Sequence, residues 1–352
     1  MRMVPPSGKG LRLPVSRMTL WQKRWWVLAV LAIAALTQGC RDPMKGVALG
    51  VFDIDLSSQT IRTELESIHT LGANTVSLPV YWYQQDVTAH EIRPYAEAGF
   101  DSARYDDLMR TAIRQAHGAG LGVLLMPVVQ LEQTGKGKWR GALQPLSWDA
   151  WFDSYERFLL HYARLAEEEG VGLFSVGSEL SSAEAHVAHW RALIESVRVT
   201  YSGELTYSAN WDHYRQVAFW DEVDYLGTSA YYELTDEVPT TYAALHSGWR
   251  RIRRELERWQ RSVGKPLLIT EIGYPSTSTA ARKPWDYTGG KLDLQQQSLC
   301  YRAFFEAWRG SRSLAGTFLW IWEPGRGGPA DRGYAWRGKP AEAEIAAWYR
   351  EN

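Results

Sequence analysis

The sequence predicts a single α/β domain, a closed (β/α)8 barrel, that follows an N-terminal signal segment. From residue 46 onward, eight short runs rich in apolar and β-branched residues alternate with amphipathic helical stretches. This alternation is typical of parallel βα repeats. A doubly wound open sheet is the main structural alternative, but no G-x-G-x-x-G motif follows the first run. Eight repeats match barrel closure, so residues 46–352 are expected to form one domain.

The individual elements follow from hydrophobic periodicity. The predicted strands cover residues 47–54, 75–83, 122–131, 172–177, 204–209, 225–230, 266–270 and 315–321. The predicted helices cover residues 61–71, 105–119, 148–169, 183–199, 242–262, 294–309 and 341–349. The fifth helical pattern, near 216–222, is the only short one. Helix-start and helix-stop signals accompany several of them, namely Ser147 and Thr241 before helices and Gly72, Gly120, Gly170 and Gly264 after them.

The first 39 residues have the pattern of an export signal rather than of the fold. Lys23 and Arg24 precede an apolar run, residues 25–36, that is short for a membrane span. The run leads into Gly39-Cys40, which resembles a bacterial lipoprotein cleavage site, so residues 1–39 are expected to be removed and Cys40 to be lipidated, with 40–45 as a tether. An uncleaved anchor and an ordinary signal peptide are the alternatives. Met18 is an alternative start.

All three interpretations of this segment place the domain outside the cytoplasm, in the cell envelope of a bacterium. Arg41 replaces the Asp that commonly retains lipoproteins in the inner membrane, so the resemblance favours the outer membrane or cell surface. If Cys40 carries lipid, Cys300 has no disulfide partner. The domain must then be stabilised by its core, which a chain of this length can supply.

Composition excludes one class of partner and favours another. The chain has 39 basic and 40 acidic residues, so it lacks the strongly basic surface that nucleic-acid binding requires. A neutral polymer is the more natural partner, and a monomer is expected. The 18 Trp and 18 Tyr residues predict either ring-stacking surfaces or an aromatic core. No metal-binding spacing and no G-x-S-x-G motif occurs, so neither a metal, a cofactor nor a serine nucleophile is expected.

Two glutamates follow buried strands at the end of the barrel where active sites form. The fourth strand leads into Glu179 and the seventh into Glu271. A carboxylate at the end of an apolar strand is costly unless it is solvated, paired or useful, and two at one barrel mouth repel each other. A capping or salt-bridge role could explain either one alone, but the pair at these two strands indicates a catalytic site.

The segments around these glutamates, GSEL at 177–180 and TEIGYPS at 270–276, resemble those of clan A glycoside hydrolases, most closely family 113, whose characterised members are β-mannanases. The likeness covers nearly all of residues 46–352. It implies a retaining mechanism, with Glu179 as acid/base and Glu271 as nucleophile. The two carboxyl groups should then lie about 5 Å apart. Glu179 is expected to stay protonated because the Glu271 anion is near.

Other strand ends supply candidate sugar-binding residues. The resemblance implies an aromatic hydroxyl, Tyr231, that orients the nucleophile, and a Trp beneath the reacting sugar, for which Trp320 is preferred over Trp322. The remaining candidates follow the first six strands or lie in the loop after the seventh, and they are Asp53, Trp82, Trp139, Asn210, Trp211 and Trp285. Core packing is the alternative for each Trp, and helix capping for Asp53.

Two departures from the clan pattern concern the substrate rather than the chemistry. Ser178 stands where many members have an Asn that binds the sugar 2-hydroxyl, and the second strand lacks their Arg. The leading hypothesis is an endo-acting β-1,4-mannanase. A glycosidase that trims the cell's own exopolysaccharide or cell-wall glycan, and a lipoprotein that binds glycan without cleaving it, are the alternatives.

Overall fold

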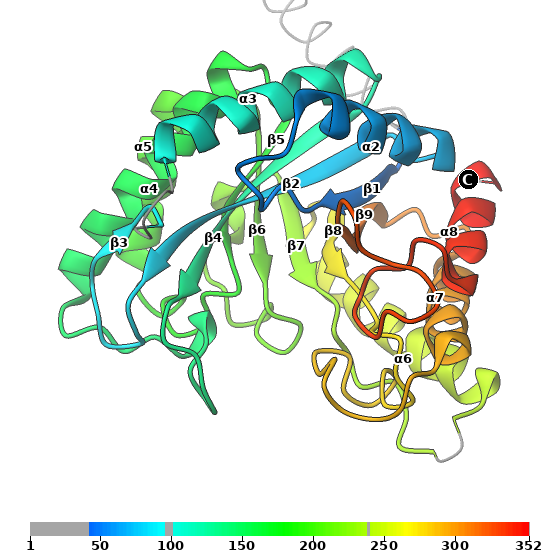
Figure 1. Cartoon of the computed structure of the whole chain (residues 1–352). Coiled ribbons are helices and arrows are strands. Elements are labelled where there is room, and N and C mark those ends of the chain that lie inside the picture. Colours follow the sequence, from blue (N-terminus) through cyan, green and yellow to red (C-terminus); the bar gives the residue numbers. More distant parts are fainter. Residues whose placement is uncertain (1–41, 96–100, 238–239, 352) are drawn as a thin grey trace, which may run out of the picture. The chain divides into compact units, whose positions relative to one another are not determined.

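A closed parallel barrel makes up the described part of the chain. The computed structural model describes residues 42–95, 101–237 and 240–351. Eight strands run parallel in one sheet, which closes because β1 pairs with both β2 and β9 (Figure 1). The predicted (β/α)8 barrel is therefore confirmed. The predicted signal segment and Cys40 lie outside the described residues. Within the described ranges, no helix is long and apolar enough to cross a membrane.

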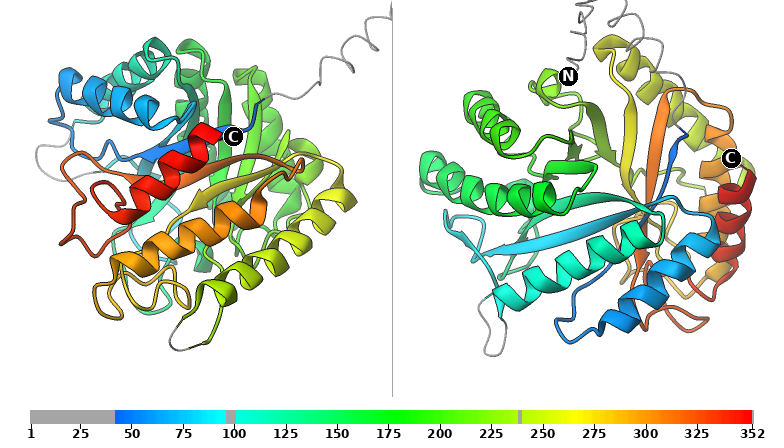
Figure 2. Two further views of the ribbon diagram at one scale, coloured as in Figure 1. Left: turned by 90° about the vertical axis from the view of Figure 1, so that its right-hand side faces the viewer. Right: turned by 90° about the horizontal axis from the view of Figure 1, so that it is seen from above.

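The strands are β1 (Met44–Leu49), β2 (Thr75–Gln84), β3 (Ile92–Arg93), β4 (Gly122–Leu131), β5 (Leu173–Ser178), β6 (Glu204–Ala209), β7 (Tyr225–Ser229), β8 (Leu267–Ile272) and β9 (Leu314–Trp322). The helices are α2 (Ser58–Leu71), α3 (Ser102–Gly118), α4 (Trp148–Glu168), α5 (Val187–Thr200), α6 (Tyr242–Val263), α7 (Leu294–Trp308) and α8 (Pro340–Glu351), with the 3-10 turns η1 (Arg140–Ala142) and η2 (Trp220–Glu222). Figure 2 shows the helices surrounding the strands.

Two predicted boundaries and one strand differ from the structure. The predicted strand 47–54 ends at Leu49, since the ladder to β9 is irregular there and only Gly50 N–H still donates to Trp322 O, at 2.8 Å. The predicted helix 183–199 begins at Val187, after a run of turns. The short β3, which pairs antiparallel with β2 outside the barrel, was not predicted. Each difference lies at the barrel rim, where turns override local periodicity.

The helix-end signals explain why the helices start and stop where they do. The side chains of Ser147 and Thr241 accept hydrogen bonds from the backbone of the first turns of α4 and α6, as predicted. Gly72 and Gly264 end α2 and α6 in the left-handed conformation, with φ of 107° and 81°. Residues with a Cβ adopt this conformation only with difficulty, so glycine stops the helices there.

Side chains close the barrel at the amino ends of the strands, and aromatic residues fill the layer outside it. The cluster within the barrel consists of Leu124, Leu173, Tyr225, Leu268 and Phe318. Large indoles fill the space between helices and strands, and those below 2% exposure are Trp151, Trp190, Trp249, Trp308 and Trp336. Much of the aromatic excess is therefore core, and only the carboxyl ends of the strands remain open to a ligand.

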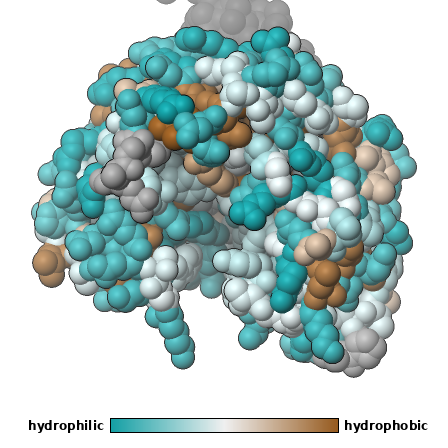
Figure 3. Space-filling model, in the orientation of Figure 1, coloured by the Kyte–Doolittle hydropathy of each residue, from teal (hydrophilic) through white to brown (hydrophobic). Residues whose placement is uncertain are grey.

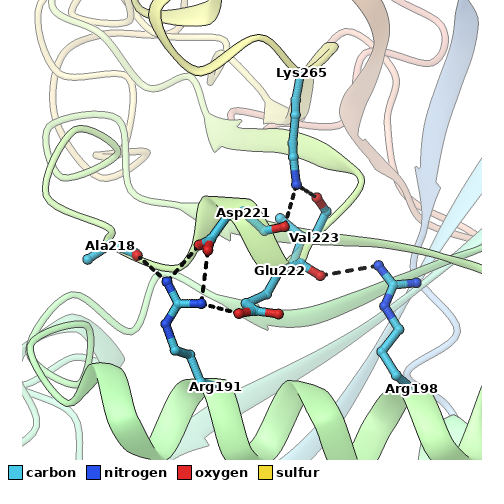
Figure 4. A network of polar contacts seen from close by, with 7 residues as sticks. All are labelled: Arg191, Arg198, Ala218, Asp221, Glu222, Val223 and Lys265. Atoms are coloured by element: carbon cyan, nitrogen blue, oxygen red, sulfur yellow. Dashed lines mark hydrogen bonds and ion pairs between the residues drawn. The ribbon is translucent and has the colours of Figure 1, made fainter.

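A polar network takes the place of a full helix between β6 and β7, as the short fifth helical pattern predicted. The 3-10 turn η2 lies between α5, which carries Arg191 and Arg198, and Lys265 of the segment before β8 (Figure 4). The Arg191 guanidinium forms ion pairs with Asp221 and Glu222, and the Lys265 ammonium donates to Asp221 O at 2.7 Å. The network stabilises the amino-terminal end of the barrel, away from the strand ends that carry Glu179 and Glu271.

Close packing of α6 gives a stability prediction. A Cβ on Gly248 would lie 2.4 Å from the carbonyl oxygen of Leu234, so Gly248→Ala should lower the free energy of unfolding by about 1–3 kcal/mol. The matched control is Gly118→Ala in α3, where nothing lies within 4 Å of the added methyl group. This change should raise the unfolding free energy by about 0.5–1 kcal/mol, since alanine favours helix. Urea denaturation measures both, and two changes of the same sign would contradict the packing argument.

Candidate active site

The two glutamates predicted to be catalytic lie at the carboxyl ends of two barrel strands. Glu179 directly follows β5, and Glu271 is the next-to-last residue of β8. Their exposed fractions are 7% and 6%, and both line one hollow at the barrel mouth. In Figure 3 the surface is hollowed on the side toward which the strands run. The barrel thus brings together two carboxylates that stand 92 positions apart in the chain.

Burial and the neighbouring charges shift the pKa of Glu271. Burial, and then the charge of Glu179, raise the pKa of Glu271 to about 7. The guanidinium of Arg140 and a hydrogen bond from the Tyr231 hydroxyl to Glu271 Oε1 act in the opposite direction. Tyr231 follows β7, so the structure brings the predicted orienting hydroxyl onto the predicted nucleophile.

Arg140 is a charged site residue that the sequence analysis missed. It begins η1 in the loop after β4, and its Nη2 donates to Glu179 Oε2 at 2.6 Å. Glu179 was expected to hold the proton; the structure places the Arg140 cation on this carboxyl group, and the expected proton stays a prediction. Burial lowers the pKa of Arg140, but the charges of Glu179 and Glu271 outweigh it and raise this pKa. In the sequence, only its position as a charged residue in a loop after a strand pointed to Arg140, and such a position is weak evidence for a site residue.

The space around this cluster extends to both sides of it. Arg140, Glu271 and Trp320 line two hollows of about 360 and 680 Å³, a size typical of small-ligand sites. The larger hollow contains further predicted residues, namely Trp139, Asn210, Trp211 and Trp285. The indoles of Trp211 and Trp285 lie parallel, with ring centroids 6.0 Å apart. Their part in sugar binding stays a prediction.

The structure does not bring four other predicted residues into either hollow. Trp82 stacks on Phe158 of α4, because its strand position points outward. Trp322 is 4% exposed and donates its indole N–H to Glu64 of α2. Asp53 is exposed and its Oδ1 accepts the backbone N–H of Asp55, which makes it part of a turn. Ser178 is 1% exposed, and its Oγ is buried without a hydrogen-bond partner among the described residues.

Several aromatic residues that were not predicted take their place. Tyr81 and Tyr83 of β2 line the smaller hollow, with Phe52 and Tyr105. Tyr287 and Tyr334 line the larger one. The alternation of side chains along β2 could have predicted Tyr81 and Tyr83. Successive residues of a strand point to opposite faces, so if Trp82 faces the helices, its two neighbours face the barrel mouth. The described residues contain no group of three His, Cys, Asp or Glu side chains able to hold a metal ion.

A closed (β/α)8 barrel with two buried glutamates at the ends of β5 and β8 defines a class of enzyme, the barrel glycoside hydrolases. The sequence pattern of Glycoside Hydrolase Family 113 matches residues 53–339. The chain belongs to this family, as its sequence motifs suggested, and it is a glycoside hydrolase. No curated protein sequence matches it.

Solved structures agree with this assignment. A GH113 β-mannanase from Alicyclobacillus acidocaldarius, AaManA in complex with ManMIm, is 29% identical with a TM-score of 0.78, over 88% of this chain and 98% of that one. A complex of a GH113 β-1,4-mannanase, 26% identical, has the same TM-score over 89% of this chain and 100% of that one. A β-glucuronidase from Faecalibacterium prausnitzii, 14% identical over 88% of this chain and 49% of that one, has a TM-score of 0.59 and shows the fold alone.

The charges around Glu271 predict the acid limb of the pH profile. A nucleophilic carboxylate must be ionised, so kcat/KM should rise as pH rises through about 7, the pKa of Glu271 in the free enzyme. Because the Arg140 cation lowers this pKa, Arg140→Gln should move the limb to higher pH. Lys138→Gln, which removes an exposed cation from the same hollow, is the control and should leave it in place. A limb unmoved in Arg140→Gln would contradict the proposed coupling.

Proposed function

We propose that this chain is an endo-acting, retaining β-1,4-mannanase. The observation that carries the proposal is the pair of buried glutamates, each with its own partner, in a hollow that extends to both sides of them. Similarity to family 113 β-mannanases over nearly the full length of both chains supports the choice of a β-mannan. Room on both sides of the cleaved bond suits attack within a polymer rather than at its end.

In the first proposed step, a carboxylate oxygen of Glu271 attacks the anomeric carbon of a mannosyl residue. The bond from that carbon to the glycosidic oxygen breaks, and the Glu179 carboxyl group donates its proton to the departing oxygen. The product is a mannosyl ester of Glu271. The hydroxyl of Tyr231, hydrogen-bonded to Glu271 Oε1, orients the nucleophile before attack.

In the second step, the Glu179 carboxylate takes a proton from water as the water oxygen attacks the same carbon. The ester bond to Glu271 breaks, and the sugar leaves with its original configuration. The reacting state requires a proton on Glu179 and a charge on Glu271. The Arg140 guanidinium, which contacts Glu179 and lowers the pKa of Glu271, helps to stabilise that charge.

The exposed aromatic rings fit the proposed substrate. Trp139 and Trp285 are 39% and 45% exposed at the rim of the larger hollow, and Trp320 lies between the two hollows. Flat rings match the CH face of a pyranose, and the neutral sugar offers only hydroxyl groups for polar contacts. We assign these rings to the sugars on either side of the cleaved bond.

Removal of each glutamate tests the proposed roles. Glu271→Ala should lower release of reducing sugar from β-mannan by about 10⁴-fold or more, because the covalent route is lost. The control is Glu233→Ala, an exposed glutamate after β7, which should retain activity. In Glu179→Ala, azide should restore turnover of 2,4-dinitrophenyl β-mannobioside, whose leaving group needs no proton, and yield a β-mannosyl azide, since the small anion needs no general base.

The outcomes separate the functions considered. Release from another glycan, lost in Glu271→Ala, would keep the mechanism and change the substrate to a glycan of the cell's own envelope. An α-configured azide product would contradict the retaining mechanism. Binding of mannan without any release, unchanged in Glu271→Ala, would favour a glycan-binding protein.

We also propose that the enzyme is exported and anchored by a lipid on Cys40. The support is the sequence alone, a basic and apolar segment that ends in Gly39-Cys40. In bacteria fed radiolabelled palmitate, the full chain should be labelled and recovered with membranes, whereas Cys40→Ser should lose the label. Cys300→Ser, at the buried second cysteine, is the control and should remain labelled. Equal labelling of both variants would overturn the anchor.

A further inference from the structure

The backbone that presents Glu179 is held in an unusual conformation. Among the described residues, Glu179 is the one non-glycine residue with a positive φ, 55°. Side chains disfavour this region sterically, so surrounding contacts must stabilise it. The Glu179 N–H donates to Ser208 O at 2.8 Å, and the Leu180 N–H donates to the Tyr207 hydroxyl at 3.1 Å. Both acceptors belong to β6, so this strand holds the turn that aims the predicted acid/base.

Tyr207 is held in turn by a buried glutamate. Its side chain is fully buried, and its hydroxyl donates to Glu184 Oε1 at 2.8 Å. Burial raises the pKa of Tyr207 well above its usual value, so the hydroxyl keeps its proton. With that proton directed to Glu184, an oxygen lone pair remains for the Leu180 N–H. Without Glu184, the hydroxyl could rotate and this acceptor position would no longer be specified.

Besides Tyr207, the described polar partner of Glu184 is His213. Glu184 is 3% exposed, five positions after Glu179, and it lines neither hollow at the barrel mouth. Burial raises the pKa of Glu184 to about 7, and the charge of Asp212 adds to this. Its Oε2 makes no hydrogen bond and lies 3.5 Å from Nδ1 of His213. A buried acidic group is costly, so its retention beside the catalytic turn calls for a role.

We propose that Glu184, acting through the Tyr207 hydroxyl, is a positioning residue that holds the turn at Glu179 and thereby aims the general acid at the glycosidic oxygen. The inference rests on the proposed function, because it assigns Glu179 the acid role. Glu184 itself contacts neither substrate nor the reacting atoms. Its contribution is the orientation of the Tyr207 hydroxyl, which accepts the N–H of Leu180, the residue after the acid.

The dependence of rate on the leaving group tests this inference. We expect kcat/KM of Tyr207→Phe on phenyl β-mannobioside, whose leaving group needs protonation, to fall by about tenfold to 100-fold. On 2,4-dinitrophenyl β-mannobioside, whose leaving group departs as an anion, it should change little. Glu184→Leu should show the same pattern, and Glu184→Gln, which still accepts from Tyr207, should restore most of the phenyl activity.

The matched control is Tyr201→Phe, which removes another buried tyrosine hydroxyl hydrogen bond, to Val171 O at 2.8 Å, before β5. It should leave the ratio of the two rates unchanged. Equal losses on both substrates in Tyr207→Phe would reduce the network to a structural role and overturn the inference, with the proposed function intact. A Glu184→Gln variant as damaged as Glu184→Leu would overturn the acceptor role of Glu184. A wild-type enzyme inactive on both substrates would overturn the proposed function and the inference together.

Discussion

Two carboxyl groups buried in one hollow, Glu179 and Glu271, impose the constraint on which the rest of the site depends. Burial, and then the charge of Glu179, raise the cost of ionising Glu271. The cation of Arg140, from the loop after β4, and the hydroxyl of Tyr231, at the end of β7, offset this cost. Four strand ends must therefore meet within hydrogen-bonding reach, and parallel closure of the barrel is what brings them there.

In the barrel, the residues that stabilise the fold lie apart from the residues of the proposed reaction. Apolar side chains fill its interior at the amino end, indoles fill the layer beneath the helices, and the ion pairs around η2 brace the same end. The carboxyl end carries the polar groups that destabilise a core. It also carries the left-handed backbone at Glu179, whose conformational cost is offset by the hydrogen bond that the Glu179 N–H donates to Ser208 O of β6.

Charge on the two glutamates connects the site to the proposed reaction. The Arg140 guanidinium lies on Glu179 and also lowers the pKa of Glu271, so one cation acts on both carboxyl groups. In the proposed reaction the acid therefore shares its cationic partner with the nucleophile, and Tyr231 gives the nucleophile a hydrogen bond of its own.

The sequence by itself determined the fold and the strand-end positions of the two glutamates, because periodicity and strand-end position are local properties of the chain. The resemblance to a known family, also a property of the sequence, pointed to Tyr231. The sequence did not determine which aromatic residues face the hollow: Trp82 and Trp322 are packed against helices, while Tyr81 and Tyr83 line the site. Strand phase decides this, and a one-residue shift reverses it. Arg140 and the contacts of Glu184 were decided only by the tertiary structure, because loop conformation and long-range burial bring together groups whose spacing in the sequence carries no signal.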